Sequence, residues 1–254
     1  MSTPARPARG TLYVIPSLLG VVEPSAVLPQ RTIDVVRELA HFVVETPRIA
    51  RQFLKSLGPT RPLPAIAMST LDEHTPTDRV PRYLAPALQG HDLGLITDAG
   101  APAVADPGAA LVKAAHAEEI RVVPLVGPSA VLLALMASGM NGQAFAFHGY
   151  LPVKPGPREA ALRKLDRAAV AGATQLFIEA PYRNDAVIAA VLATCRKDLR
   201  FCVAADLTLR SEQIVCRTIG QWRTAAPASF ARRPAMFLLG TYPVGVAVTR
   251  PASS

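Results

Sequence analysis

The sequence has little of the chemistry that builds metal centres and disulfide scaffolds. Its 254 residues include three cysteines, Cys195, Cys202 and Cys216, and no two of them have CxxC spacing. Cysteines in this arrangement argue against a disulfide framework or a zinc site and are typical of a protein in the reducing cytoplasm. The five histidines lie far apart in the sequence and form no HxxxH pair, so we expect no metal ion.

The usual loops for phosphates and for nucleophilic serines are also absent. There is no GxxxxGK[ST] loop, no GxGxxG after an expected strand, and no GxSxG elbow. These absences argue against a P-loop nucleotide hydrolase, a Rossmann-type dinucleotide enzyme and an α/β-hydrolase.

Charge is scarce but strongly biased in sign. Only 18% of the residues are charged and 50% are hydrophobic, which is enough to build a buried core, yet the net charge is +8. A basic balance favours a polyanionic partner, with nucleic acid first. The densest basic segment begins with Lys154 and Arg158 and continues through Arg163, Lys164 and Arg167. It is either a track for an RNA backbone or a solvated helix face, and with 6% aromatic residues no base-stacking cluster accompanies it.

Residues 122–153 contain no Asp, Glu, Lys or Arg, which is long enough to suggest a membrane span. Prolines and glycines cut this stretch into short pieces, so we expect a strand, a loop, a buried helix and a second strand in the interior, and no membrane association. The first ten residues are polar and carry no apolar run of a secretory signal.

Short apolar runs alternate with helical patterns along the chain, which is typical of an α/β fold with parallel or mostly parallel sheets. We expect strands at 12–15, 42–45, 66–69, 93–97, 121–126, 144–148, 175–179, 201–205, 212–219 and 236–239, with helices at 29–40, 47–57, 77–89, 107–119, 130–138, 158–169 and 184–195 and a short helix from 221. Thr46-Pro47 predicts a cap and a first helical residue, Gly58 predicts the end of the helix 47–57, and Pro81 and Pro86 predict a kink or two short pieces in 77–89. A proline-rich linker at 150–157 predicts two domains, residues 10–149 and 150–243. Flexible ends are expected at 1–9 and 244–254.

Residues 95–108, LITDAGAPAVADPG, are the most informative segment. The strand ends abruptly in Asp98-Ala99-Gly100, and Asp106-Pro107 has the form of an N-cap followed by a first helical residue. Open α/β sheets bind their ligands beyond the carboxyl ends of the strands. Pro16-Ser17, 127–130, 179–181 and 206–208 follow other expected strands in the same way. These loops are small and neutral or acidic, so they suit a ligand with a positive or neutral reacting centre, held by backbone groups.

Taken in order, these segments resemble a known family. LYVIP at 12–16, TDAGAPAVADPG at 97–108, PLVGPSA at 124–130, EAPYR at 179–183, DLT at 206–208 and Glu212 resemble the tetrapyrrole methylase superfamily, and within it the ribosomal RNA small-subunit methyltransferase I branch. The resemblance covers most of residues 10–240. It implies two α/β domains with a ligand cleft between them, S-adenosylmethionine as methyl donor, and a homodimer.

The same resemblance assigns roles to individual residues. The donor-binding residues that it implies are Pro16, Asp98, Ala99, Gly100, Asp106, Ser129, Ala130, Glu179, Ala180, Asp206, Leu207, Thr208, Pro234 and Ala235. A sulfonium is cationic, so carboxylates and carbonyls near it are favourable. Glu45 and Glu179 near strand ends are candidate catalytic residues, or else salt-bridged rim residues. Arg48, Arg183, Lys154 and Arg158 are the candidate residues for the acceptor.

The chain departs from the RNA-acting branch in its first third. That branch has PTPIGNLxDIT after the first strand, whereas this chain has PSLLGVVE at 16–23 and so lacks the Asn and the Asp. The branch's EDTR appears as Glu45-Thr46-Pro47-Arg48. Three functions therefore compete: ribose 2′-O-methylation of small-subunit ribosomal RNA, methylation of a tetrapyrrole or another small acceptor, and non-catalytic binding of the donor or of RNA.

Overall fold

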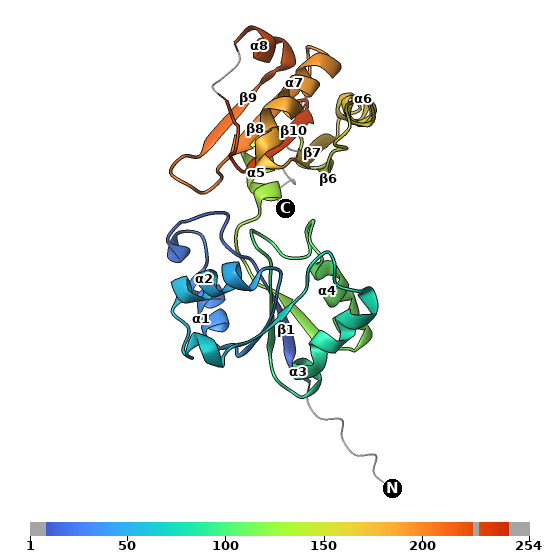
Figure 1. Ribbon diagram of the computed structural model, residues 1–254. Helices are drawn as coiled ribbons and strands as arrows, with labels where there is room; N and C mark the ends of the chain where they lie inside the picture. The colour runs from blue at the N-terminus through green and yellow to red at the C-terminus, as the bar shows by residue number, and fades with distance from the viewer. Residues whose placement is uncertain (1–8, 226–228, 244–254) are drawn as a thin grey trace, which may run out of the picture. The chain divides into compact units, whose positions relative to one another are not determined.

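The computed structural model describes residues 9–225 and 229–243 (Figure 1). The chain divides into two compact units, residues 1–129 and 130–254. The sequence predicts this boundary too late, at 149/150, because residues 130–150 form a helix and a strand that pack in the second unit. The proline-rich segment 150–157 accordingly connects two elements of the second unit. The flexible ends expected at 1–9 and 244–254 lie, apart from Arg9, outside the described residues.

The first unit is built on a parallel sheet with strand order β3-β2-β4-β1-β5. Its strands are β1 (Thr11–Ile15), β2 (His41–Val44), β3 (Ala67–Thr70), β4 (Leu93–Ile96) and β5 (Arg121–Pro124). Its helices are η1 (Pro24–Ala26), α1 (Gln30–Glu38), α2 (Pro47–Leu57), η2 (Leu63–Ala65), η3 (Thr77–Leu84), α3 (Ala85–Leu88) and α4 (Gly108–Ala117).

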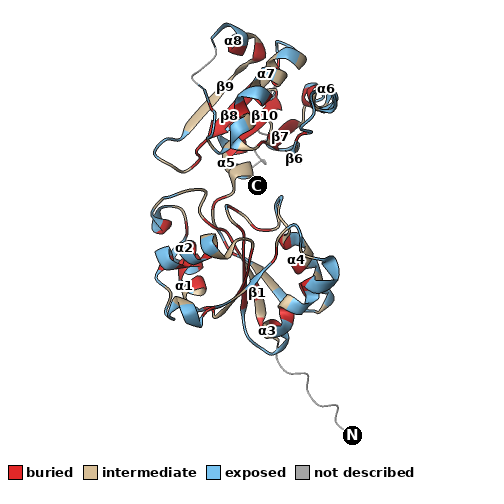
Figure 2. Cartoon of the chain, viewed as in Figure 1, coloured by how far each residue is buried: buried red, intermediate tan, exposed pale blue. Residues whose placement is uncertain are grey.

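Helices cover both faces of this sheet. Successive side chains along each strand point to opposite faces, so alternate residues pack against different helices. In β2, Phe42 and Val44 belong to a core cluster with α1 and α2, whereas Val43 belongs to a cluster with Leu84 of η3 and Leu111 of α4. The buried strands in Figure 2 are therefore apolar on both sides. This is the pattern expected for a parallel sheet between helical layers.

Proline and glycine residues end or interrupt helices of the first unit, as the sequence predicts. Gly58 takes φ +67° and ends α2. The helical segment 77–89 is divided into η3 and α3, with Pro81 inside η3 and Pro86 in the first turn of α3. One cap differs from expectation: Thr46 precedes α2 but its side chain makes no cap hydrogen bond, because its hydroxyl donates to Asp98 instead.

The second unit has a mixed sheet with strand order β6-β7-β10-β8-β9. Strand β6 is parallel to β7, and the other neighbours are antiparallel. Its strands are β6 (Phe145–Tyr150), β7 (Thr174–Ile178), β8 (Arg200–Ala205), β9 (Gln213–Thr218) and β10 (Ala235–Gly240), and its helices are α5 (Ala130–Ser138), α6 (Pro155–Val170), η4 (Pro181–Arg183), α7 (Asn184–Thr194) and α8 (Ile219–Thr224).

Aromatic side chains fill the main core of the second unit. The rings of Phe177 and Phe237 stack with centroids 5.4 Å apart, and Phe201 lies 5.3 Å from the ring of Trp222. The indole of Trp222 donates a hydrogen bond of 2.8 Å to the carbonyl of Phe201, so its one polar atom is satisfied. Helices α6 and α7 cover this face of the sheet, while α5 packs against β8, β9 and β10.

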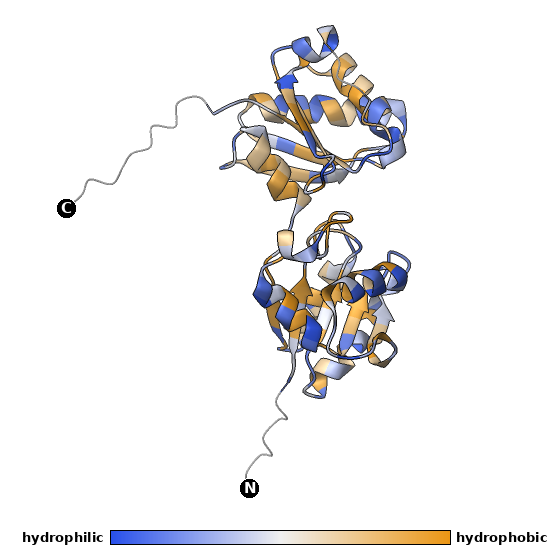
Figure 3. Ribbon diagram, turned by 90° about the vertical axis from the view of Figure 1, so that its left-hand side faces the viewer, coloured by the Kyte–Doolittle hydropathy of each residue, from blue (hydrophilic) through white to orange (hydrophobic). Residues whose placement is uncertain are grey.

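Both units thus have the predicted class of fold, α/β with a parallel sheet in one unit and a mixed sheet in the other. Hydrophobic residues concentrate on the strands inside each unit and hydrophilic residues on the outward helix faces (Figure 3). Among the described residues, the helices are too short or too polar for any one of them to span a bilayer.

The tight packing of the first sheet is testable at Gly94 in β4. A Cβ added there would lie 2.6 Å from Cδ1 of Phe42 and 2.8 Å from Cδ1 of Ile15. We expect Gly94→Ala to lower the free energy of unfolding by about 1–3 kcal/mol, as overpacking does in other cores. Urea unfolding followed by far-UV circular dichroism measures this. The matched control is Gly142→Ala, where a Cβ meets nothing within 4 Å and a change within about 0.5 kcal/mol is expected. Equal effects at the two positions would contradict this account of the sheet.

Candidate active site at the strand ends

The carboxyl ends of β2 and β4 carry two carboxylates that are held in a reciprocal pattern. The strands pair in register up to Val44 and Ile96, so Glu45 comes opposite Thr97, and Thr46 opposite Asp98. Glu45 Oε2 accepts hydrogen bonds from the Thr97 hydroxyl at 2.8 Å and from the Asp98 N–H at 3.2 Å. Asp98 in turn accepts from the Thr46 N–H at 3.0 Å and from the Thr46 hydroxyl at 2.8 Å. We call these four residues the carboxylate clamp.

The carboxylate clamp fixes one predicted catalytic residue and one predicted donor-binding residue at the same edge. Both oxygens of Asp98 are engaged with Thr46, whereas the two bonds to Glu45 fall on Oε2 and leave Oε1 free of them. Sequence reasoning selected Glu45 and Asp98 but missed the two threonines. The signal for them was present in the paired Glu-Thr and Thr-Asp dipeptides that follow two neighbouring strands.

The end of β1 approaches the same edge. The Ser17 N–H donates to the Gly100 carbonyl at 2.9 Å, and Gly100 takes φ +77°, a backbone conformation that favours glycine. The Ser17 side chain is 2% exposed and its hydroxyl has no hydrogen-bond partner among the described residues. A buried hydroxyl without a partner costs free energy, so it marks a place where a ligand atom would be favourable.

The loop from Asp98 to Gly108 is strained and also leaves an oxygen unpaired. Ala103 and Ala105 have φ of +66° and +64°, which few alanines adopt. Asp106 Oδ1 accepts from the N–H groups of Ala103 and Gly108, while its Oδ2 is buried with no partner. Asp106 is therefore not the predicted N-cap, because the helix begins at Gly108 and Pro107 stands at the cap position, although Asp106 does accept from the N–H of the first helical residue.

Glu179 is the most deeply buried carboxylate of the second unit. It follows β7, and its side chain is 1% exposed. Oε1 accepts from the Ala180 N–H at 2.8 Å and from the guanidinium of Arg183, whose Nε lies 2.8 Å away. Oε2 is buried with no partner among the described residues. Arg183, expected to contact the acceptor, pairs with this carboxylate.

Asp206 follows β8 at the same edge of the second sheet. It takes φ +53° and accepts a 2.8 Å hydrogen bond from Nε of Arg233, and its N–H donates to the Pro234 carbonyl at 2.9 Å. Thr208 takes φ +73°, and its buried hydroxyl has no partner among the described residues. Sequence reasoning missed Arg233, because nothing in the local pattern links it to an aspartate in another strand.

The remaining predicted residues are placed less distinctively. Leu207 is buried, and Ala180 and Ala235 are half-buried beside the residues just described. Ser129 and Ala130 lie on either side of the boundary between the units. The predicted acceptor residues Arg48 and Lys154 are exposed, at the starts of α2 and α6, and Arg158 is half-buried on α6.

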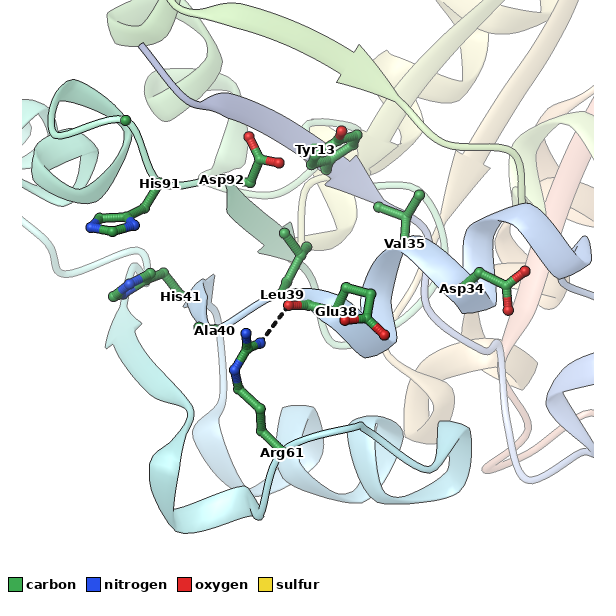
Figure 4. A pocket seen from close by; sticks show the side chains of 11 residues that line it. Tyr13, Asp34, Val35, Glu38, Leu39, Ala40, His41, Arg61, His91 and Asp92 are labelled. Carbon is green, nitrogen blue, oxygen red and sulfur yellow. Dashed lines mark hydrogen bonds between the residues drawn. The ribbon is translucent and has the colours of Figure 1, made fainter. Parts of the chain in front are cut away.

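One pocket lies at the opposite, amino-terminal end of the first sheet, and the sequence did not predict it. It has a volume of about 550 Å³ and is lined by Tyr13, Glu38, His41, Arg61, His91 and Asp92, among others (Figure 4). Burial, with nearby His91 and Arg61, lowers the pKa of His41. Arg61 donates to the Glu38 carbonyl and Asp92 accepts from the Thr11 N–H, so these charged groups stabilise the fold. Within the described residues, no group of three or more metal-ligating side chains gathers.

Comparisons with known proteins agree with this architecture. The model of the tetrapyrrole (corrin/porphyrin) methylase family matches residues 26–222. The chain is 34% identical over 240 residues to the ribosomal RNA small subunit methyltransferase I of Xylella fastidiosa, covering 94% of this chain and 82% of that protein. It is 33% identical over 216 residues to the protein of the same name from Mesorhizobium japonicum, covering 85% and 70%.

Solved structures share the fold at lower identity. The crystal structure of the methyltransferase CobJ matches with a TM-score of 0.61 and 20% identity, covering 93% of this chain and 97% of that one. The uroporphyrin-III C-methyltransferase of Thermus thermophilus, complexed with S-adenyl homocysteine, matches with a TM-score of 0.52 and 18% identity, covering 91% and 97%.

The carboxylate clamp can be tested by a double-mutant cycle. We expect Thr46→Val and Asp98→Ala to show a coupling free energy of about 1.5 kcal/mol in urea unfolding, since a carboxylate accepts the hydrogen bond of the Thr46 hydroxyl in a half-buried site, and valine retains the backbone N–H. The control cycle uses Glu159 and Arg163, an exposed pair 3.8 Å apart on α6, for which about 0.3–0.5 kcal/mol is expected. A clamp coupling no larger than the control would refute its structural role.

Proposed function

The chain belongs to the tetrapyrrole methylase family, and on that premise we propose that it transfers a methyl group from S-adenosylmethionine to a ribose 2′-hydroxyl of small-subunit ribosomal RNA. Membership of this family makes the chain a methyltransferase. The observation that carries the RNA acceptor is similarity, at 34% identity across 94% of the chain, to a protein named for that activity. The tetrapyrrole enzymes among the solved structures share the fold at 16–20% identity, which supports no claim about the acceptor.

The unpaired buried oxygens at the strand ends fit the proposed donor. Hydroxyl, amine and ammonium groups of a nucleoside amino acid donate hydrogen bonds, and its sulfonium is positive. Ser17 Oγ, Asp106 Oδ2, Glu179 Oε2 and Thr208 Oγ1 are acceptors that lack partners among the described residues. Acceptor-rich, acidic edges suit a cation better than a triphosphate, which needs lysine, arginine and a glycine-lined nest. The donor contacts predicted for Pro16, Ala99, Gly100 and the second unit belong to the same proposal.

Methyl transfer requires the protein mainly to align the donor with the acceptor and to supply a weak base. When bound, the donor supplies an electrophilic methyl group for in-line displacement, and alignment is the larger part of such catalysis. A ribose hydroxyl must also lose its proton. Glu45 is the candidate to accept that proton: Thr97 and the Asp98 N–H hold its Oε2, which leaves Oε1 free of those two bonds. Glu179 is the weaker candidate, because its side chain is buried and its Oε1 is already engaged by Arg183.

Exposed cations supply the proposed contact with the RNA backbone. Arg48 is exposed three residues after Glu45, on the first turn of α2. Lys154, Arg163, Lys164 and Arg167 are exposed on and before α6. Together with the net charge of +8, they favour a polyanionic acceptor. We also propose a homodimer, as the family resemblance implies, and a cytoplasmic location, as the pattern of the cysteines indicates.

Methyl transfer can be tested on RNA from cells that lack the protein. With labelled S-adenosylmethionine, we expect counts in the small-subunit ribosomal RNA. Glu45→Gln is expected to lower kcat by about 100-fold or more with little change in donor Kd, since a general base contributes that much. Asp98→Asn is expected to weaken donor binding in calorimetry by about 10-fold, because it disturbs the clamp.

Three results would count against the proposal. Label confined to small molecules would favour a tetrapyrrole or another small acceptor. Donor binding with no transfer to any fraction would favour a non-catalytic relative. Unchanged donor affinity in a folded Asp98→Asn variant would place the donor elsewhere.

The RNA contact predicts a measurable salt dependence. Lys154→Ala combined with Arg167→Ala should weaken RNA binding and reduce the slope of log Kd against log salt by about two, one for each cation removed. The matched control, Arg79→Ala with Arg82→Ala, removes the same charge from exposed positions of η3. If both double variants change the slope equally, the α6 cations are not a specific RNA track.

A further inference from the structure

Two of the three cysteines face each other across neighbouring strands of the second sheet. Cys202 of β8 is the direct register partner of Cys216 of β9, and both are free thiols. Directly opposed residues of antiparallel strands have Cα atoms about 4.5–5.5 Å apart, and disulfides span about 4.4–6.8 Å. Register partners also point to the same face of a sheet. The register therefore brings the two cysteines within the range of Cα separations that disulfides span.

The surroundings make the two thiols unequal. Cys202 is fully buried, whereas Cys216 is partly exposed. The Cys202 thiol hydrogen-bonds to Cys216, and the Tyr242 hydroxyl donates to Cys216 Sγ at 4.0 Å. Arg200 lies two residues before Cys202 on the same strand, and its guanidinium carbon sits 3.6 Å from the centroid of the Tyr242 ring. The Cys216 sulfur is thus partly accessible, lies near the Arg200 guanidinium and has two hydrogen-bond donors. The Cys202 sulfur is buried on the neighbouring strand.

These groups act on the titration of Cys216 in a consistent direction. The hydrogen bond from Cys202 is the largest influence, and with Tyr242 and Arg200 it lowers the pKa of Cys216 to about 7 despite partial burial. The pKa of Cys202 is raised, by the same hydrogen bond and by burial. A thiolate near neutral pH is the reactive form of cysteine, and a buried thiol beside it is suited to resolve an oxidised neighbour.

We propose that Cys216 and Cys202 form a peroxide-responsive dithiol, in which Cys216 is oxidised first and Cys202 then closes a reversible disulfide between β8 and β9. The Cys216 thiolate attacks one oxygen of hydrogen peroxide, the O–O bond breaks, and Cys216 sulfenic acid and hydroxide form. Cys202 sulfur then attacks the Cys216 sulfur, the S–O bond breaks, and water leaves as Cys202 gives up its proton. Overall two thiols lose two electrons and two protons, and the peroxide becomes two waters.

Cys195 provides a control within the same chain. It is buried at the end of α7, where burial and the neighbouring Asp166 raise its pKa to about 12. No cysteine opposes it in a strand pair. It is expected to stay reduced under conditions that oxidise the other two. The inference does not depend on the acceptor or on the donor site.

The test uses the full-length reduced protein and hydrogen peroxide. After oxidation, alkylation and non-reducing peptide mapping, we expect a Cys202–Cys216 peptide that dithiothreitol removes, with Cys195 alkylated. Cys195→Ser should form the same bridge. Cys202→Ala should accumulate sulfenic acid at Cys216, detected with dimedone. In the untreated protein, alkylation of Cys216 at pH 7 should be at least about 100-fold faster than that of Cys195, and half-maximal near pH 7.

Specific outcomes would overturn the proposal. They are retention of both thiols at peroxide concentrations that oxidise a free thiol, a bridge only between different chains, or dimedone labelling of Cys195 in preference to Cys216. The alkylation rates need no substitution, so they decide the question even where Cys202→Ala fails to fold.

Discussion

The hydrogen bonds that tie Glu45 to Thr97 and Asp98 to Thr46 determine what the first unit can do. Where two parallel strands end, their next backbone groups have no ladder partner, and two carboxylates close together repel one another. Here each strand end supplies one carboxylate and one threonine, and each carboxylate accepts from the other strand's hydroxyl and from a backbone N–H. The side chains thus extend the pairing of β2 and β4 beyond the sheet. They also hold two acidic groups in fixed positions at the edge where open α/β sheets bind ligands.

In the second unit, arginines rather than threonines hold the carboxylates at the strand ends. Glu179 and Asp206 are nearly buried, and each is paired with a guanidinium, from Arg183 and Arg233 respectively. Separating the members of such a pair leaves a buried charge without a partner, which costs free energy. These pairs therefore hold the edge in one arrangement. The strained residues Asp206 and Thr208, with φ of +53° and +73°, lie at the same edge as the unpaired oxygens of Glu179 and Thr208. Backbone strain and unpaired oxygens therefore occur together at this edge, as expected where binding and stability make opposed demands.

Local chemistry was readable from the sequence, whereas contacts distant in sequence were not. Alternating apolar runs gave nearly every strand, Gly58 gave the end of α2, and the loop after β4 gave the site edge, because each depends on a few adjacent residues. The domain boundary was misplaced because the uncharged stretch 122–153 has no local sign of which sheet buries its helix and strand. Thr46 reads as a helix cap until the register of β2 and β4 brings it to Asp98. Arg233 and the opposed cysteines likewise depend on pairings that only the folded sheet provides.

The longer of the two departures from the RNA-acting branch is the segment 16–23 after β1, and the structure shows what that segment contacts. After β1, Ser17 donates its N–H to Gly100, and Leu19 Cδ2 lies 3.1 Å from where a Cβ at Gly100 would be. Leu18 is partly buried against the core of α1 and α2. The altered segment therefore still supports the turn that carries Asp98 and Gly100, while replacing polar groups by apolar ones around it. Under the proposed function, a change of this kind keeps the support of the proposed donor edge and alters what surrounds it, so we expect it to affect the choice of acceptor rather than the fold.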